Sequence, residues 1–272
     1  MRLALCQMKV GMSKKENVEK ACSMIREAVS NGADIAALPE MFSCPYSNSY
    51  FREYAEYGDG ETVKTLSALA RENGIYIVGG SIPELDGDKV YNTSFIFGKK
   101  GELIGRHRKV HLFDIDVEGG IRFKESDTLS PGNSITVVET EFCRIGVAIC
   151  YDVRFPELSR LMALEGAELI ILPAAFNMTT GPVHWDLSMR MRALDNQVYF
   201  AAVSPARDMN GVYQAYGNSC VASPWGEFAA HIDENEGILY CDIDLDRIKK
   251  VRNELPLLKH RREDMYKLEL LK

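Results

Sequence analysis

Strand-like and helix-like segments alternate along the whole chain, and this alternation constrains the fold more than any other feature. Apolar residues recur with a helical period over residues 14–30 and 61–72, and each stretch ends at a glycine or an Asn-Gly stop. The second half repeats the pattern, with helices expected at residues 156–164 and about 184–195. Such alternation predicts an α/β fold in which sheets and helices form layers.

The expected strands are short and apolar, as in sheets covered on both faces. They lie at residues 3–8, 34–38, 76–79, 94–97, 103–108, 144–150, 169–172 and 198–203, with later hairpin strands at 217–221, 228–232 and 238–243. Turn signals at residues 86–88 and 99–101 add hairpins to the alternating pattern, which favours layered sheets over a regular barrel. Because no low-complexity linker interrupts the 272 residues, we predict one domain over residues 1–272.

Composition argues against several classes of protein. A net charge of −7 and the absence of a long basic cluster argue against nucleic acid as a partner. The apolar runs fall short of the ~20 residues that a membrane span needs, so no membrane partner is expected. Seven scattered cysteines without a CxxC pair favour free thiols in a reducing, cytoplasmic compartment over disulfides or a zinc site. We expect neither a metal nor a cofactor.

Cys150 stands where a predicted buried strand turns sharply toward a helix that opens at Pro156. Helix N–H groups beside such a sulfur would stabilise the thiolate and lower its pKa. They would also direct hydrogen-bond donors at a carbonyl under attack. The alternative is an ordinary buried core cysteine, because free cysteine is among the most buried residue types.

Three further charged residues also stand at the ends of structured segments. Glu40 ends an apolar strand behind the rigid Pro39, and Glu125 follows an acidic loop. In the basic segment 106–111, strict alternation places Lys109 and both histidines on one face of the strand. The two arginines lie on the other face. The ordinary alternatives are a solvated strand-end carboxylate for Glu40 and a surface-strand lysine for Lys109.

The segments around these residues carry a family resemblance. They are, in order, Leu38-Pro39-Glu40, Lys109-Val110-His111-Leu112-Phe113-Asp114 and Ile149-Cys150-Tyr151-Asp152-Val153-Arg154-Phe155-Pro156-Glu157. Together with Glu125 they resemble the nitrilase superfamily of carbon–nitrogen hydrolases, and the resemblance covers essentially the whole chain. It implies a four-layer αββα sandwich with two mixed β-sheets, and catalysis by Glu40, Lys109, Cys150 and Glu125.

The resemblance also implies a chemistry. Cys150 would attack an amide carbon, Glu40 would serve as general base, and Lys109 with the N–H of Tyr151 would stabilise the oxyanion. Glu125 would orient Lys109 and the amide nitrogen or the hydrolytic water. Ammonia would leave, and water would cleave the resulting thioester.

Residues 177–185 look like the omega-amidase branch, which hydrolyses the terminal amide of dicarboxylic acid monoamides such as 2-oxoglutaramate and succinamate. Glu118 stands where the resemblance would place a proline, and this departure predicts a looser loop before Glu125. The rivals are a nitrilase, a carbamoylase or an amidase for deaminated glutathione. A noncatalytic binding relative is the other class, and loss of Glu40, Lys109 or Cys150 would be its usual sign.

The distal carboxylate of such a substrate needs a cation. Arg154 is the candidate, and its alternative role is an ion pair with Asp152 or Glu157 that holds the turn. The remaining candidates for the substrate site are the backbone of Tyr151, hydroxyls from Tyr46, Thr179 and Thr180, an apolar wall from Phe176, and Arg190 and Arg192 as competing cations.

The C-terminal segment 253–272 is charged but carries several leucines. It predicts either a frayed terminal helix or an arm that packs on a second subunit. The family's dimers favour the arm, and a homodimer is expected.

Overall fold

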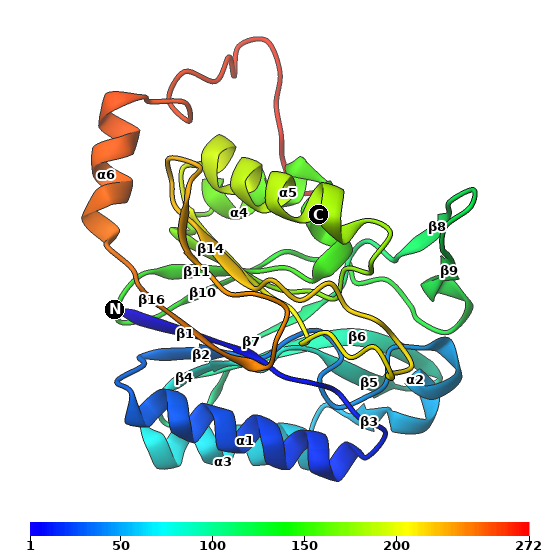
Figure 1. The fold of residues 1–272 in the computed structure, drawn as a ribbon. Coiled ribbons are helices and arrows are strands. Elements are labelled where there is room, and N and C mark those ends of the chain that lie inside the picture. Colours follow the sequence, from blue (N-terminus) through cyan, green and yellow to red (C-terminus); the bar gives the residue numbers. More distant parts are fainter. Residues whose placement is uncertain (272) are drawn as a thin grey trace.

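The computed structural model describes residues 1–271, in which two mixed sheets lie face to face between layers of helices (Figure 1). The first sheet has the order β16 (Gly237–Asp242), β1 (Arg2–Gln7), β2 (Ile35–Ala37), β4 (Tyr76–Val78), β6 (Lys89–Phe97), β5 (Ile82–Asp86) and β3 (Glu56–Tyr57), and β7 (Leu103–Arg108) also pairs with β6. The second sheet has the order β10 (Thr136–Glu139), β11 (Arg144–Val147), β12 (Leu169–Pro173), β13 (Tyr199–Val203), β14 (Cys220–Ala222) and β15 (Phe228–His231).

Helices cover the outer face of each sheet. In Figure 1, α1 (Lys14–Ser30) and α3 (Glu61–Asn73) lie below the first sheet, and α4 (Pro156–Leu164) and α5 (Gly181–Asn196) lie above the second. The smaller elements are α2 (Asn48–Tyr54), the hairpin of β8 (Asp114–Asp116) and β9 (Arg122–Lys124), the 3₁₀ helices η1 (Glu125–Asp127) and η2 (Cys150–Arg154), and α6 (Leu245–Glu254). The four-layer αββα sandwich is therefore confirmed.

Alternation along the strands explains the layers. Leu3 and Leu5 of β1 pack between the sheets with Ile171 of the second sheet, whereas Cys6 packs on the other face with Ile25 of α1. In the second sheet, the neighbours of Ile171 along β12 face outward and pack against α4 and α5. Both faces of each central strand are thus apolar, as strands covered on both sides require.

Most of the predicted elements are present, and helix 156–164 has the predicted bounds. Three predictions were wrong in detail. The strand expected to reach Cys150 ends at Val147, and Gly217, at φ +73°, lies before β14 instead of within it. The third late strand, β16, pairs antiparallel with β1 of the first sheet instead of forming a hairpin with the strand before it. Local sequence patterns predict strands well but do not say which sheet receives them.

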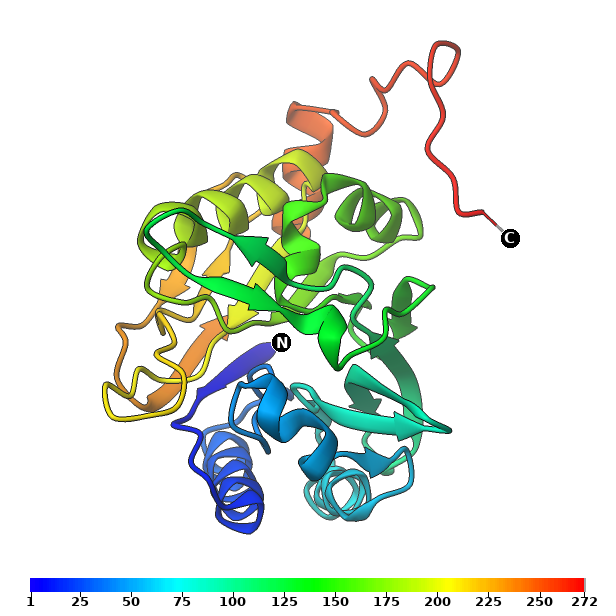
Figure 2. The ribbon, with the colours of Figure 1, turned by 90° about the vertical axis from the view of Figure 1, so that its right-hand side faces the viewer.

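The C-terminal tail is irregular. Helix α6 ends at Glu254, and residues 255–271 run on without a further helix (Figure 2). The prediction of a frayed terminal helix over residues 253–272 was therefore wrong for the described part, and Lys272 lies outside the described residues. Contact of this tail with a second subunit stays a prediction. Within residues 1–271, no helix combines the length and the apolar character needed to cross a membrane.

Candidate active site

The four predicted catalytic residues lie together, each just after a strand or at the start of a short helix. Glu40 lies in the turn after β2, Lys109 immediately follows β7, and Glu125 and Cys150 begin η1 and η2. All four side chains are buried, and Lys109 and Glu125 are fully inaccessible to solvent. The solvated alternatives for Glu40 and Lys109 are therefore wrong.

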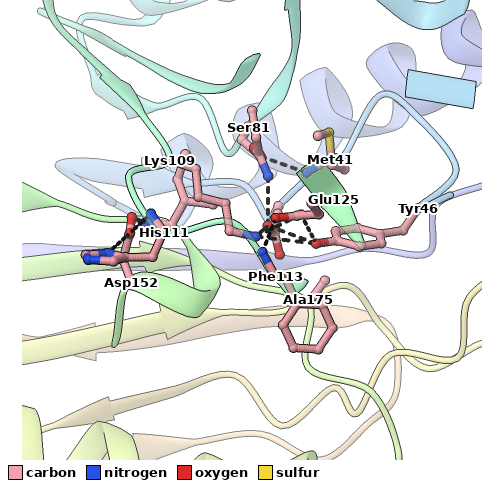
Figure 3. Close-up of polar contacts among 12 residues, drawn as sticks. Met41, Tyr46, Ser81, Lys109, His111, Phe113, Glu125, Asp152 and Ala175 are labelled. Atoms are coloured by element: carbon pink, nitrogen blue, oxygen red, sulfur yellow. Dashed lines mark hydrogen bonds and ion pairs between the residues drawn. The ribbon is translucent and has the colours of Figure 1, made fainter. Parts of the chain in front are cut away.

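The ammonium group of Lys109 lies between two carboxylates. Its Nζ donates to Oε1 of Glu40 and to Oε1 of Glu125, each at 2.9 Å, and to the Tyr46 hydroxyl at 3.5 Å (Figure 3). Burial alone would lower the pKa of Lys109, but the negative charges of Glu125 and Glu40 and the neighbouring Cys150 raise it well above its usual value. The lysine is therefore a fixed positive charge that faces two negative ones.

Glu40 keeps one oxygen without a partner. Its Oε1 accepts hydrogen bonds from Lys109 and from Asn92 Nδ2 at 2.9 Å, and the Tyr46 hydroxyl, whose proton points to Glu125, lies 3.3 Å away. Its Oε2 is buried and receives no hydrogen bond from any residue in the range 1–271. Burial raises the pKa of Glu40 while Lys109 opposes the rise and Glu125 adds to it. The free oxygen is thus suited to accept a proton, because its acid form is stabilised and its lone pairs are unoccupied.

Glu125 is held by its own set of donors. The main-chain N–H of Phe113 donates to Oε2 at 2.7 Å, and the Tyr46 hydroxyl donates to Oε1 at 2.6 Å. The preceding hairpin turns at Glu118 and Gly119 without disturbing these bonds. The missing proline therefore does not leave Glu125 loosely placed.

Cys150 adopts an unusual backbone conformation. Its φ is +45°, in the left-handed region that costs a non-glycine residue roughly 1–2 kcal/mol. Contrary to the expected lowering by helix N–H groups, burial and the negative charge of Glu40 raise the pKa of the thiol well above its usual value. Lys109 and the main-chain N–H of Ala175 only partly offset this rise. The neutral thiol of Cys150 is therefore favoured, and the Glu40 carboxylate lies beside it.

Met41, directly after Glu40, is also left-handed, with φ at +50°. Its main-chain N–H donates to the Ser81 hydroxyl at 3.0 Å, inside the protein (Figure 3). Both turns therefore hold a non-glycine residue in a strained conformation, and the Met41 turn is fixed by a hydrogen bond to a buried side chain.

A cavity of about 200 Å³ reaches this cluster at Glu40, Tyr46 and Ala175. Its other walls come from residues 10–12 and from the loop at 205–215, and they include the acidic Asp208. Among the described residues that line it, none is a lysine or an arginine. A negatively charged group of a ligand would find no cationic side chain on these walls.

Comparison with known proteins identifies the family. Residues 2–253 match the family model described as carbon-nitrogen hydrolase.

The chain belongs to the carbon–nitrogen hydrolase family.

Relatives and solved structures agree with this assignment. Omega-amidase NIT2 of Xenopus tropicalis is 53% identical over 98% of this chain and 97% of its own length, and that of Homo sapiens is 51% identical over 100% and 98%. The structure of Saccharomyces cerevisiae Nit3, a member of branch 10 of the nitrilase superfamily, superposes with a TM-score of 0.89 at 44% identity, covering 96% of both chains. This chain is an amide-hydrolysing enzyme of the carbon–nitrogen hydrolase family.

The residues predicted to bind substrate in this hydrolase have mixed surroundings. The Tyr46 hydroxyl belongs to the carboxylate cluster, and Thr180 donates to Asn177 Oδ1 at 3.4 Å. Thr179 is exposed, with its main-chain N–H bonded to the same Asn177 oxygen. Phe176 is buried and packs edge-to-face on Trp185.

Arg154 does not make the ion pair expected of a purely structural arginine. Its guanidinium lies 4.9 Å from the ring centre of Phe176 and 5.6 Å from that of Tyr151, and it contacts His184 Nδ1 at 3.2 Å. Within residues 1–271 it forms no ion pair with Asp152 or Glu157, and Asp152 contacts His107 and His111 instead. Arg154 is therefore a half-buried cation beside two rings of the predicted substrate site.

The two competing arginines are committed elsewhere. Arg190 donates to the Gly226 carbonyl at 2.6 Å, and its guanidinium lies over the ring of Phe228. Arg192 donates to the Val153 carbonyl at 2.9 Å and pairs with Asp195 at 2.6 Å. Their contacts favour a structural role for both.

Sequence reasoning missed several partners of the hydrolase site. Asn92 was not singled out, although its carbonyl accepts from the Lys109 N–H and its side chain holds Glu40. The Phe113 N–H and the Ser81 hydroxyl were missed as well. These partners are visible only once strand register is known, because they lie on other strands or loops far along the chain.

Proposed function

We propose that this enzyme hydrolyses the terminal amide of dicarboxylic acid monoamides, of the 2-oxoglutaramate and succinamate type, through a cysteine thioester. Its relatives from Xenopus tropicalis, Mus musculus and Homo sapiens, at 50–53% identity, bear the name omega-amidase. The observation that carries the chemistry is the buried Lys109 ammonium, 2.9 Å from both Glu40 and Glu125, with one Glu40 oxygen left free.

Acylation uses the free oxygen. Glu40 takes the proton of the Cys150 thiol as the sulfur attacks the amide carbon. Because the two events coincide, no free thiolate has to form inside the protein. Lys109 and the N–H of Tyr151 stabilise the tetrahedral oxyanion. Glu40 then gives the proton to the leaving nitrogen, the carbon–nitrogen bond breaks, and ammonia departs from a thioester on Cys150.

Deacylation reuses the same groups. Glu40 removes a proton from water as the water oxygen attacks the thioester carbon, and the proton returns to the departing sulfur. Glu125 keeps Lys109 in place through both steps by the 2.9 Å ion pair, and it is itself fixed by the Phe113 N–H. The products are the dicarboxylic acid and the free thiol.

Arg154 binds the distal carboxylate in this proposal. It is a half-buried cation beside the ring of Phe176, the predicted apolar wall, and the ring of Tyr151, whereas the walls of the cavity at Glu40 offer no basic side chain. Of the rival cations, Arg190 and Arg192 already donate to main-chain carbonyls. Tyr46, Thr179 and Thr180 retain at most a minor part in binding the acyl chain.

The test is ammonia release from 2-oxoglutaramate, succinamate, glutamine, a carbamoyl amino acid and an aliphatic nitrile. We expect the first two to be the best substrates and Cys150→Ala to abolish their turnover. Preference for the carbamoyl amino acid or the nitrile would favour another carbon–nitrogen hydrolase activity. Full activity of Cys150→Ala would contradict the thioester route.

Arg154→Met separates substrate binding from support of the turn. We expect KM for succinamate to rise roughly ten- to a hundredfold, because a charge-assisted pair worth about 1.5–3 kcal/mol is lost. Hydrolysis of a neutral short amide should change much less. Equal losses on both substrates would show that Arg154 supports the Cys150 turn instead.

We also propose a homodimer in a reducing, cytoplasmic compartment. Helix α5 exposes Val183, Leu187 and Met191, spaced four residues apart on one face, which supports an apolar contact with a second copy. The cysteines of the described chain are all free, which supports a reducing compartment. Sedimentation of the wild type and of Leu187→Glu tests the dimer, which the charge should weaken.

A further inference from the structure

Asp152 accepts four N–H groups from three residues although none of its surface is exposed. Its Oδ1 accepts from the main-chain N–H of His111 at 2.9 Å and from His111 Nδ1 at 2.8 Å. Its Oδ2 accepts from His107 Nε2 at 3.1 Å and from the main-chain N–H of Ile149 at 3.0 Å. Every donor faces an oxygen, so the group is saturated as an acceptor.

The donors come from the two segments that carry the nucleophile and the ammonium group. Ile149 immediately precedes Cys150, and His107 and His111 flank Lys109 by two residues on either side. Figure 3 shows Asp152 meeting His111 beside the backbone from which Lys109 extends. One carboxylate therefore joins the Cys150 turn to the Lys109 segment.

The Cys150 turn needs such support because its backbone is strained. Cys150 has φ at +45°, and Asp152 is the third residue of the short helix that begins there. By accepting the N–H of the residue before the helix, Asp152 forms the acidic half of a capping box across the strained residue. Release of this bond would let the turn relax and carry the sulfur away from Glu40.

We propose that Asp152 is a positioning residue that sets the spacing between the Cys150 sulfur and the Lys109 ammonium. The inference rests on the proposed function in one respect, namely that Cys150 and Lys109 act on the same carbonyl. Asp152 itself does not touch the reacting atoms. A displacement of about 1 Å in such a pair costs on the order of a hundredfold in rate.

Asp152→Asn is a nearly isosteric test. Whichever way the amide is turned, its NH₂ meets a main-chain N–H that cannot accept, from His111 at one oxygen position or from Ile149 at the other. We expect kcat on succinamate to fall about a hundredfold with little change in KM, as a geometric change of about 1 Å predicts. The rate of Cys150 alkylation by iodoacetamide, followed by mass spectrometry, should fall as well.

Glu84→Gln is the matched control. Glu84 is an equally buried carboxylate that accepts from Arg106 and Arg108, on the opposite face of the same strand β7. Its substitution should lower the melting temperature while kcat and Cys150 alkylation stay at wild-type values. If Asp152→Asn behaves like Glu84→Gln, with a lower melting temperature and wild-type kcat, Asp152 has only a structural role and the inference is overturned.

His111 supplies a second test that does not depend on the folding of Asp152→Asn. His111→Asn keeps a side-chain N–H near the Nδ1 position but loses the ring that stacks on Phe155 at 3.7 Å. His111→Phe keeps a stacked ring and loses the donor. We expect His111→Asn to retain most of kcat and His111→Phe to lose about tenfold, the effect of one hydrogen bond to a charged group.

The outcomes separate the two proposals. The reverse order of the His111 variants, or equal kcat in both, would overturn the positioning role. An active Cys150→Ala would instead overturn the proposed function, whatever the Asp152 variants do. If Asp152→Asn lowers both kcat and the rate of Cys150 alkylation, and Cys150→Ala is inactive, the positioning role and the proposed function are both supported.

Discussion

Two buried clusters of carboxylates lie on opposite faces of the segment around β7, and they are built differently. Glu84 faces Arg106 and Arg108, and its two oxygens accept from both guanidiniums and from the Thr93 hydroxyl. Glu40 and Glu125 share the single ammonium of Lys109. With Asp86, which pairs with Arg108 at 2.7 Å, the first cluster has two carboxylates for two guanidiniums, and both Glu84 oxygens have donors. The second has more negative than positive charge and one free oxygen.

The difference shows how the proposed catalytic cluster departs from a saturated structural one. A saturated buried ion pair stabilises one conformation and has no capacity left for a ligand. An unbalanced cluster is less favourable for folding, because burial and Glu125 raise the pKa of Glu40. That same imbalance suits Glu40 to the proposed role of a base that takes a proton from Cys150. Alternation along one strand separates the two roles, since Arg108 and Lys109 point to opposite faces.

The largest expected effect comes from neutralising one glutamate in each cluster. Glu40→Gln should lower kcat by on the order of 10²–10⁴ because the general base is lost, with stability unchanged or raised because surplus charge is removed. Glu84→Gln should leave kcat unchanged and destabilise the fold by about 1.5–3 kcal/mol, because a charged acceptor is lost. Steady-state kinetics and urea unfolding check both variants. If Glu40→Gln were active but destabilised, Glu40 would have the structural role that is assigned here to Glu84.

Removal of the adjacent cations is the next test. Lys109→Met should reduce kcat by on the order of 10²–10³, the usual cost of losing an oxyanion donor. Arg108→Met should spare kcat and cost up to roughly 3–5 kcal/mol, because Glu84 would keep only Arg106 as a charged partner. If Arg108→Met loses turnover at a temperature at which it is still folded, the Glu84 cluster does not have a purely structural role.

The pH dependence of stability tests the imbalance more finely. Because the folded-state pKa of Glu40 is raised, its proton favours the folded state. This contribution is fully present below the unfolded carboxyl pKa of about 4.3 and is lost as pH rises through the folded value. The unfolding free energy of the wild type, relative to that of Glu40→Gln, should therefore increase as pH falls from about 8 to about 4.5. A difference that is flat with pH would mean that Glu40 has an ordinary environment.

The smallest effect is expected far from both clusters. Glu118 is the second residue of a turn in which the Gly120 N–H donates to the Val117 carbonyl at 2.9 Å and Gly119 has φ at +69°. Proline suits that position, so Glu118→Pro should raise stability by about 0.4–1 kcal/mol without changing kcat. A fall in kcat would show that the hairpin must move during turnover.

Local sequence patterns predicted much of this molecule correctly. The bounds of helix α4 follow from Pro156 and the apolar period behind it, and the burial of Lys109 on the face of His107 follows from strand alternation. The motifs around Glu40, Lys109, Glu125 and Cys150 identified the family and the residues that meet in space. These features depend on neighbours along the chain, which the sequence displays directly.

The remaining features depend on what packs against each residue. The Cys150 pKa was expected to be lowered, but burial beside Glu40 raises it, and no local pattern reports the loss of solvent. Strand β16 joined the first sheet because register and layer packing selected its partner. The sequence by itself determined which residues come together in the candidate site and which segments form strands and helices. Only the tertiary structure decided their charges and partners, because desolvation and hydrogen bonding arise between segments far apart in the chain.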